Sequence, residues 1–105
     1  MTPNILAELM QQRMALIEKL ASLNSKQLSN TQTRSGIEVE LQGCLNDIDR
    51  DGDTEEARAR LADLQDRLQT AANACAECDR KWQILNDKLE ALDRQLQAVQ
   101  AGPAP

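Results

Sequence analysis

The sequence predicts an all-α protein built as a long antiparallel helical hairpin, and three observations support this fold class. No proline occurs between Asn4 and Gly102, whereas Pro3, Pro103 and Pro105 lie at the two ends of the chain. The stretch between them is dominated by Ala, Leu, Gln, Glu, Arg and Lys, which are good helix formers. No segment alternates polar and apolar residues with the period of two that is typical of a strand.

The second half of the chain carries an unbroken heptad pattern. Alternate steps of four and three residues, starting at Ala57, reach 13 positions that all hold an apolar residue or Cys. A pattern of this length is typical of a coiled-coil seam. Asp53 or Thr54 can cap the start of the helix, which we expect over about residues 54–101. The seam positions are Ala57, Leu61, Leu64, Leu68, Ala71, Cys75, Cys78, Trp82, Leu85, Leu89, Leu92, Leu96 and Val99.

The first half shows the same pattern with interruptions. Nine of its 13 seam positions are apolar or Cys, and three of the four exceptions fall within residues 24–36. We favour a continuous but weakened or kinked helix over about residues 3–50. The alternative is a break near residues 29–35 and a restart at Ser35, with Glu38 completing a capping box, which would give a three-helix bundle. The seam positions are Leu6, Leu9, Arg13, Leu16, Leu20, Leu23, Gln27, Asn30, Arg34, Ile37, Leu41, Cys44 and Ile48.

A tight turn at residues 51–53 joins the two halves, because Gly52 accepts a left-handed backbone without steric cost. Folding about this glycine places residue i close to residue 104−i, within a single domain over 1–105 that ends in a short tail at 102–105. The polar stretch of the first helix then faces a run of small residues around Cys75. We expect this middle part of the hairpin to be its weakest.

Extra apolar residues near the termini predict self-association. A stripe wider than one seam is expected to be covered by further helices, which indicates a four-helix arrangement in a homodimer or, alternatively, a helix of another protein. The residues that we expect at the dimer contact are Ile5, Leu9, Met10, Ile17 and Ile84.

Composition excludes several function classes. The chain has 12 Lys and Arg against 17 Asp and Glu, a net charge of −5, no His and one aromatic residue. Without His, Ser-His-Asp and Cys-His catalysis is excluded, so we expect a protein that is not an enzyme and needs no cofactor. The acidic balance and the single aromatic residue argue against nucleic-acid binding. With no membrane span, no secretory signal and an odd number of cysteines, we expect a cytoplasmic protein.

The whole net charge comes from residues 44–56, which hold six acids and one base, while the segments on either side are balanced. Asp47 and Asp49 would lie near a helix C-terminus, where the helix dipole disfavours acids, and this placement favours a functional role. The sequence therefore predicts an acidic tip that binds a protein partner with a basic surface, although a turn that serves only solubility is the alternative. The tip residues are Asp47, Asp49, Asp51, Asp53, Glu55 and Glu56.

The tip also allows two metal-based alternatives. Its alternating aspartates, Asp47, Asp49, Asp51 and Asp53, resemble the first part of an EF-hand calcium loop, although Arg58 stands in place of the bidentate Glu that closes such a loop. In outline, a long hairpin with an acidic tip also resembles the Gre-type factors, which reach into RNA polymerase and position Mg²⁺ with tip carboxylates. That resemblance covers shape and tip charge, and it implies a transcription-modulating hairpin.

Cys75 and Cys78 form a C-x-x-C motif within the seam. Two cysteines are half of a zinc site, so zinc or a disulfide could link two chains through them, but the favoured interpretation is core packing. Cys44 and Trp82 also occupy seam positions and are expected in the core. Gly43, inside the first helix, indicates either a close approach of the two backbones or a local bend.

Overall fold

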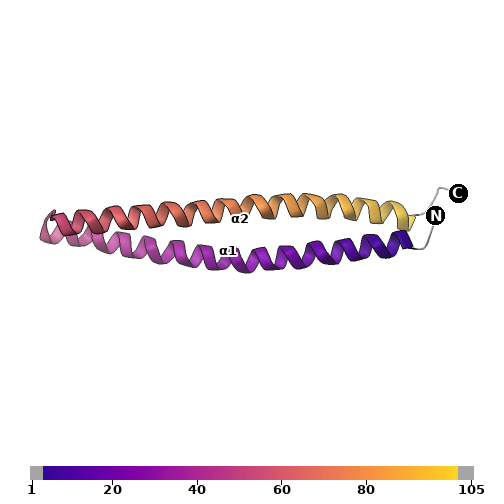
Figure 1. Cartoon of the computed structure of the whole chain (residues 1–105), viewed down its shortest axis with the longest axis horizontal. Helices are drawn as coiled ribbons and strands as arrows, with labels where there is room; N and C mark the ends of the chain where they lie inside the picture. Colours follow the sequence, from indigo (N-terminus) through magenta and orange to yellow (C-terminus); the bar gives the residue numbers. More distant parts are fainter. Residues whose placement is uncertain (1–3, 102–105) are drawn as a thin grey trace. The chain divides into compact units, whose positions relative to one another are not determined.

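The structure, a computed structural model, describes residues 4–101 and contains two helices, α1 (Asn4–Asp51) and α2 (Glu55–Ala101). Their bounds lie within one residue of the predicted ones. The chain divides into unit 1, within Met1–Ser25 and Asp79–Pro105, and unit 2, Lys26–Cys78. Within each unit, a segment of α1 and a segment of α2 run side by side in opposite directions (Figure 1). The all-α class and the antiparallel pairing of two helices are confirmed.

Helix α1 runs without a break through residues 29–35, so the alternative three-helix bundle is wrong. Ser35 does not cap a new helix. Arg34 instead pairs with Glu38 one turn later, with 3.5 Å between Nε and Oε1. Ile37 is buried against α2 immediately afterwards. Extending an existing helix by one residue costs little free energy. The Arg34–Glu38 pair and the burial of Ile37 then stabilise the helical conformation of this stretch.

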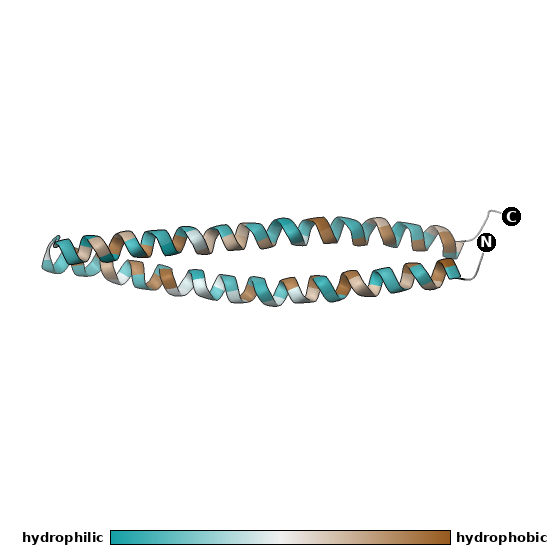
Figure 2. Ribbon diagram, in the orientation of Figure 1, coloured by the Kyte–Doolittle hydropathy of each residue, from teal (hydrophilic) through white to brown (hydrophobic). Residues whose placement is uncertain are grey.

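The polar stretch of α1 contacts α2 through side-chain amides. Gln27 Nε2 donates to the carbonyl oxygen of Cys75 at 3.2 Å, and Asn30 Nδ2 donates to that of Ala74 at 3.5 Å. Both contacts lie within unit 2 and agree with the predicted pairing of residue i with a residue near 104−i. Figure 2 shows this part of α1 in teal and white, with little brown. Hydrogen bonds therefore replace part of the apolar packing that the heptad pattern lacks here.

The heptad seam forms the core of both units. In unit 2 the buried residues include Ile37, Cys44, Leu64 and Ala71, which form one cluster. In unit 1 the buried residues are Leu20, Leu92 and Leu96. Four seam leucines and isoleucines pack against the unit 2 cluster while remaining partly exposed, namely Leu41, Ile48, Leu61 and Leu68.

Trp82 departs from the expected core position, because 36% of the residue is exposed. A seam between two helices is covered on two sides only, and an indole is wider than the leucines that fit elsewhere in the seam. The ring therefore extends past the seam toward solvent, and the expectation of a buried tryptophan is wrong.

The turn forms as the sequence predicts, with a glycine at positive φ and a capping side chain at the start of α2. Gly52 has a φ of 95°, and its N–H donates to the carbonyl oxygen of Ile48 at 2.9 Å, which satisfies a carbonyl at the end of α1. Thr54 caps α2, since its Oγ1 accepts a hydrogen bond from the N–H of Ala57 at 3.1 Å. Of the two predicted caps, Thr54 rather than Asp53 takes this role.

Gly43 makes no close approach to α2. A Cβ added at this glycine would meet no heavy atom within 4 Å beyond the neighbouring backbone of its own helix. The reason is its heptad position, one residue before the seam residue Cys44, which turns it away from the facing helix. Of the two alternatives that the sequence left open for Gly43, the close backbone contact is therefore wrong.

Candidate functional site

The acids of the predicted tip lie among arginines. Arg50 contacts Asp47 Oδ1 at 3.1 Å and Asp51 Oδ2 at 3.0 Å through the same nitrogen, Nη2. Arg60 Nη1 lies 3.6 Å from Asp47 Oδ2. The hydrogen bond to Asp51, followed by the charge of Asp47, raises the pKa of Arg50 above its ordinary value. Asp47 therefore forms ion pairs with one arginine of each helix, Arg50 and Arg60. These contacts give it a structural role, although the helix dipole alone disfavours an acid at this end of α1.

Arginines compensate part of the negative charge that the sequence predicts for the tip. Asp53 also has a partner, Arg58, with 3.2 Å between Oδ1 and Nε. Among the described residues, salt bridges reach neither Asp49 nor Glu55 nor Glu56. The ion pairs are exposed and contribute little to stability, but a partner with a basic surface must compete with three arginines. Partner binding by the tip stays a prediction.

The tip lacks the geometry of a calcium loop. Asp47 and Asp51 belong to α1, and the chain outside the helices is limited to residues 52–54. Aspartates two residues apart on a helix point about 200° apart, so they do not converge on one ion. Within residues 4–101, no three His, Cys, Asp or Glu side chains are placed to hold a metal ion together. The transcription-modulating alternative gains no metal site from this part of the chain and stays a prediction.

The three cysteines are buried in the seam. Cys44 is 1% exposed, and Cys75 and Cys78 are each 4% exposed. Cys44 Sγ contacts the carbonyl oxygen of Ala57 at 3.8 Å. Their burial supports the packing interpretation, and a zinc or disulfide link between chains through Cys75 and Cys78 stays a prediction.

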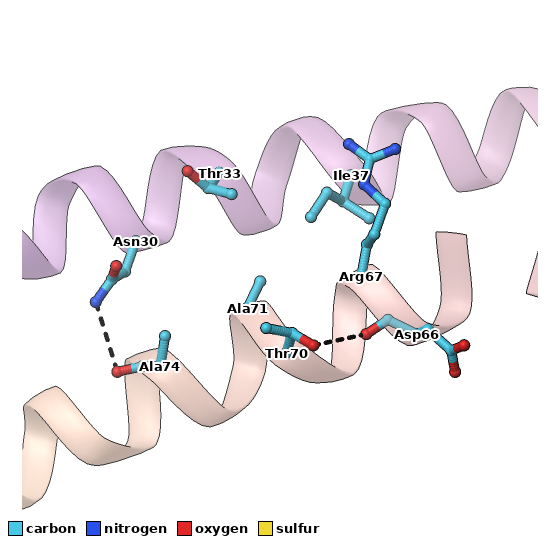
Figure 3. A pocket seen from close by; sticks show the side chains of 8 residues that line it. All are labelled: Asn30, Thr33, Ile37, Asp66, Arg67, Thr70, Ala71 and Ala74. Atoms are coloured by element: carbon cyan, nitrogen blue, oxygen red, sulfur yellow. Dashed lines mark hydrogen bonds between the residues drawn. The ribbon is translucent and has the colours of Figure 1, made fainter. Parts of the chain in front are cut away.

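Small residues of α2 leave an open groove of about 410 Å³ within unit 2. Figure 3 shows Ala71 and Ala74 facing α1, and Arg67 extending from α2 beside Ile37. The guanidinium reaches Glu40, with 3.4 Å between Nη1 and Oε2. The groove follows from the small side chains opposite the polar stretch of α1. Besides Asp66 and Arg67, its polar lining consists of Asn30 and the two threonines Thr33 and Thr70.

Unit 1 has an exposed apolar stripe along α1, which we call the outer stripe. It consists of Ala7, Met10, Met14, Ile17 and Ala21, each one position after a seam residue. Met10 is 49%, Met14 66% and Ile17 41% exposed. Figure 2 shows brown segments along α1 within this unit. The stripe has heptad spacing of its own, and this signal in the sequence would have added Met14, Ala7 and Ala21 to the predicted contact residues.

The five predicted dimer residues do not share one side of unit 1. Met10 and Ile17 belong to the outer stripe, and Leu9 lies half-buried in the seam. Ile84 lines a groove together with Lys19, which is about 200° from Ile17 around α1. Ile5 lies 14 residues, or about 40°, from Lys19, so it belongs to the side of Ile84.

No protein-family model, curated protein or solved structure matches this chain. Over the part of the chain that the structure describes, neither helix is apolar enough along a sufficient length to cross a membrane. Interpretation of function therefore depends on the exposed surfaces of the two helices.

Proposed function

We propose that the chain is a non-enzymatic helical interaction module that pairs with a second copy of itself through the outer stripe. The observation that carries this proposal is the exposure of an apolar stripe with heptad spacing. Single exposed apolar residues are normal on protein surfaces. A stripe at heptad spacing is the surface that a facing helix covers in a coiled coil or a helical bundle.

The spacing of the stripe favours a second copy as the facing helix. In an antiparallel pair of α1 helices with a two-fold axis at Met14, Ala7 faces Ala21 of the second copy, and Met10 lies within one residue of Ile17. Met14 faces its own counterpart. No charged residue occurs in the stripe, so the contact buries no unpaired charge. Two hairpins joined in this way form a four-helix arrangement.

The exposed fractions set the strength of the contact. Met10, Met14 and Ile17, with the adjoining Leu6 at 39%, expose the equivalent of about two complete side chains in each copy. At about 2 kcal/mol for each buried side chain, two copies gain about 8 kcal/mol. Association costs at least about 4 kcal/mol, which leaves about 4 kcal/mol, or a dissociation constant near 1 mM. The predicted dimer is weak and reversible.

A cysteine on the proposed two-fold axis can trap such a dimer. We expect Met14→Cys to form an interchain disulfide under mild oxidation, because the two thiols face each other across the contact. Val39→Cys is the matched control, since Val39 is also exposed on α1 but lies outside the stripe, in unit 2. The native thiols are blocked after oxidation and before denaturing electrophoresis, so that they do not contribute.

Sedimentation equilibrium of the reduced protein gives an independent measurement. Met14→Glu places two carboxylates together on the axis, and we expect it to be monomeric at concentrations where the unmodified chain associates. Equal amounts of crosslinked dimer from Met14→Cys and Val39→Cys, or association that survives Met14→Glu, would show that the outer stripe is not the self-association surface.

A further inference from the structure

The side of unit 1 that carries Ile84 contains two adjoining grooves. One, of about 370 Å³, is lined by Leu23, Ile84 and Leu85 together with Lys19 and Lys81. The other, of about 420 Å³, lies along the next turns of both helices and shares Lys19 with the first. Seam leucines one heptad apart on each helix line the two grooves, which adjoin at Lys19, and together they make one surface that we call the lysine groove.

The charge of the lysine groove is opposite to that of the chain. Lys19, Lys81 and Lys88 line it, and no Asp or Glu occurs among the lining residues of either part. The chain as a whole has a net charge of −5. The groove is therefore a local positive surface with an apolar floor.

The second part of the groove is open enough for a helix. Ala15 and Ala91 line it opposite each other, one on α1 and one on α2, and Ile84 in the first part is 56% exposed. Small residues on the walls allow another backbone to approach, and an exposed Ile offers an anchor. Lysine side chains can cover apolar surface with their methylene groups while their ammonium groups reach the rim.

We propose that the lysine groove binds an amphipathic helix whose apolar stripe is flanked by Asp and Glu. The apolar stripe would lie on the leucine floor, and its carboxylates would pair with Lys19 and Lys88 at the rim. This surface lies about 200° around α1 from Ile17 of the outer stripe, so both surfaces can be occupied at once. The inference is independent of self-association.

Two designed peptides of three heptads can test the proposal. Both carry Leu at the core positions, and they differ only in having Glu or Lys at the flanking positions. Binding of each labelled peptide to the full chain is followed by fluorescence anisotropy at low salt. We expect the Glu peptide to bind at least about tenfold more tightly than the Lys peptide, with an affinity that falls as salt screens the lysines.

Variants of the chain locate the contact. The combined substitution Lys19→Gln and Lys88→Gln is expected to weaken binding of the Glu peptide about fivefold, because each exposed pair contributes only a few-fold. The matched controls are Arg94→Gln, which removes a cation of unit 1 that does not line the groove, and Met14→Glu in the outer stripe. Both controls should bind the Glu peptide as the unmodified chain does, and circular dichroism verifies that every variant is helical.

Three results would overturn the proposal. No binding of the Glu peptide would remove the groove as a helix-binding surface, and equal binding of both peptides would show that the lysines do not select the partner. Lysine-dependent binding to phosphatidylserine vesicles, without binding to the Glu peptide, would assign the groove to an anionic lipid surface instead.

Discussion

Two glycines of this chain make a matched test of backbone conformation. A Cβ added at Gly43 or at Gly52 meets no heavy atom within 4 Å beyond the adjacent backbone, so neither alanine substitution creates a clash. The backbones differ, because Gly43 lies inside α1 and Gly52 has a φ of 95°. Both substitutions also reduce the freedom of the unfolded chain to the same extent. The difference between them therefore measures the native backbone conformation alone.

We expect the two substitutions to change stability in opposite directions. Gly43→Ala should stabilise the chain by about 1 kcal/mol, which is the difference in helix propensity between Gly and Ala. Gly52→Ala should destabilise it by about 1–2 kcal/mol, because an L-residue with a Cβ is strained at positive φ. The two variants should then differ by about 2–3 kcal/mol.

Urea unfolding followed by circular dichroism measures this difference. With a slope of about 2 kcal/mol per molar urea, the midpoint should rise by about 0.5 M for Gly43→Ala and fall by about 0.5–1 M for Gly52→Ala. All variants are compared at one protein concentration, since self-association would shift the midpoints. A loss of stability in Gly43→Ala would restore the close backbone contact that we have rejected, and an unchanged midpoint in Gly52→Ala would refute the strain argument.

Two further predictions concern the cap and the thiols. Thr54→Ala should cost about 1 kcal/mol because it removes the acceptor for the N–H of Ala57, whereas Thr54→Ser should retain most of the stability; urea midpoints check both, and equal losses would exclude the cap as the cause. The three buried thiols should react slowly with a thiol reagent in the folded chain and at the normal rate in denaturant, and rapid reaction of the folded chain would contradict their burial in the seam.

The heptad seam was predictable because its period is a local property. Each predicted seam position is buried or half-buried except Leu6, near the start of α1, and Trp82. Trp82 departs from the pattern because periodicity reports the direction of a side chain, whereas exposure also depends on its size and on how many helices surround it.

The sequence alone could not decide whether the first helix continues through its polar stretch or breaks there. The seam positions of this stretch hold Gln27, Asn30 and Arg34, which fit either a broken helix or a continuous one. The outcome depends on partners in α2, namely the carbonyl oxygens to which Gln27 and Asn30 donate. A rule that considers only the neighbours of a residue along one helix cannot count hydrogen bonds to another helix.

For the candidate surfaces too, the sequence showed which residues were present, and the tertiary structure showed which of them lie together. The acids of the tip were visible as a charge run, but compensation of Asp47 by Arg60 depends on the two helices meeting at the turn. Likewise, the apolar residues near the termini were visible as a group. Their separation into the outer stripe and the lysine groove required knowledge of which residues of α2 lie beside each side of α1.

By itself, the amino-acid sequence determined the two helices, the seam that joins them and the glycine turn, because helix propensity, heptad periodicity and turn chemistry act between residues close in the chain. Only the tertiary structure decided which charges are compensated and which apolar side chains stay exposed. Those properties depend on residues far apart in the chain, whose proximity arises when α1 and α2 pack.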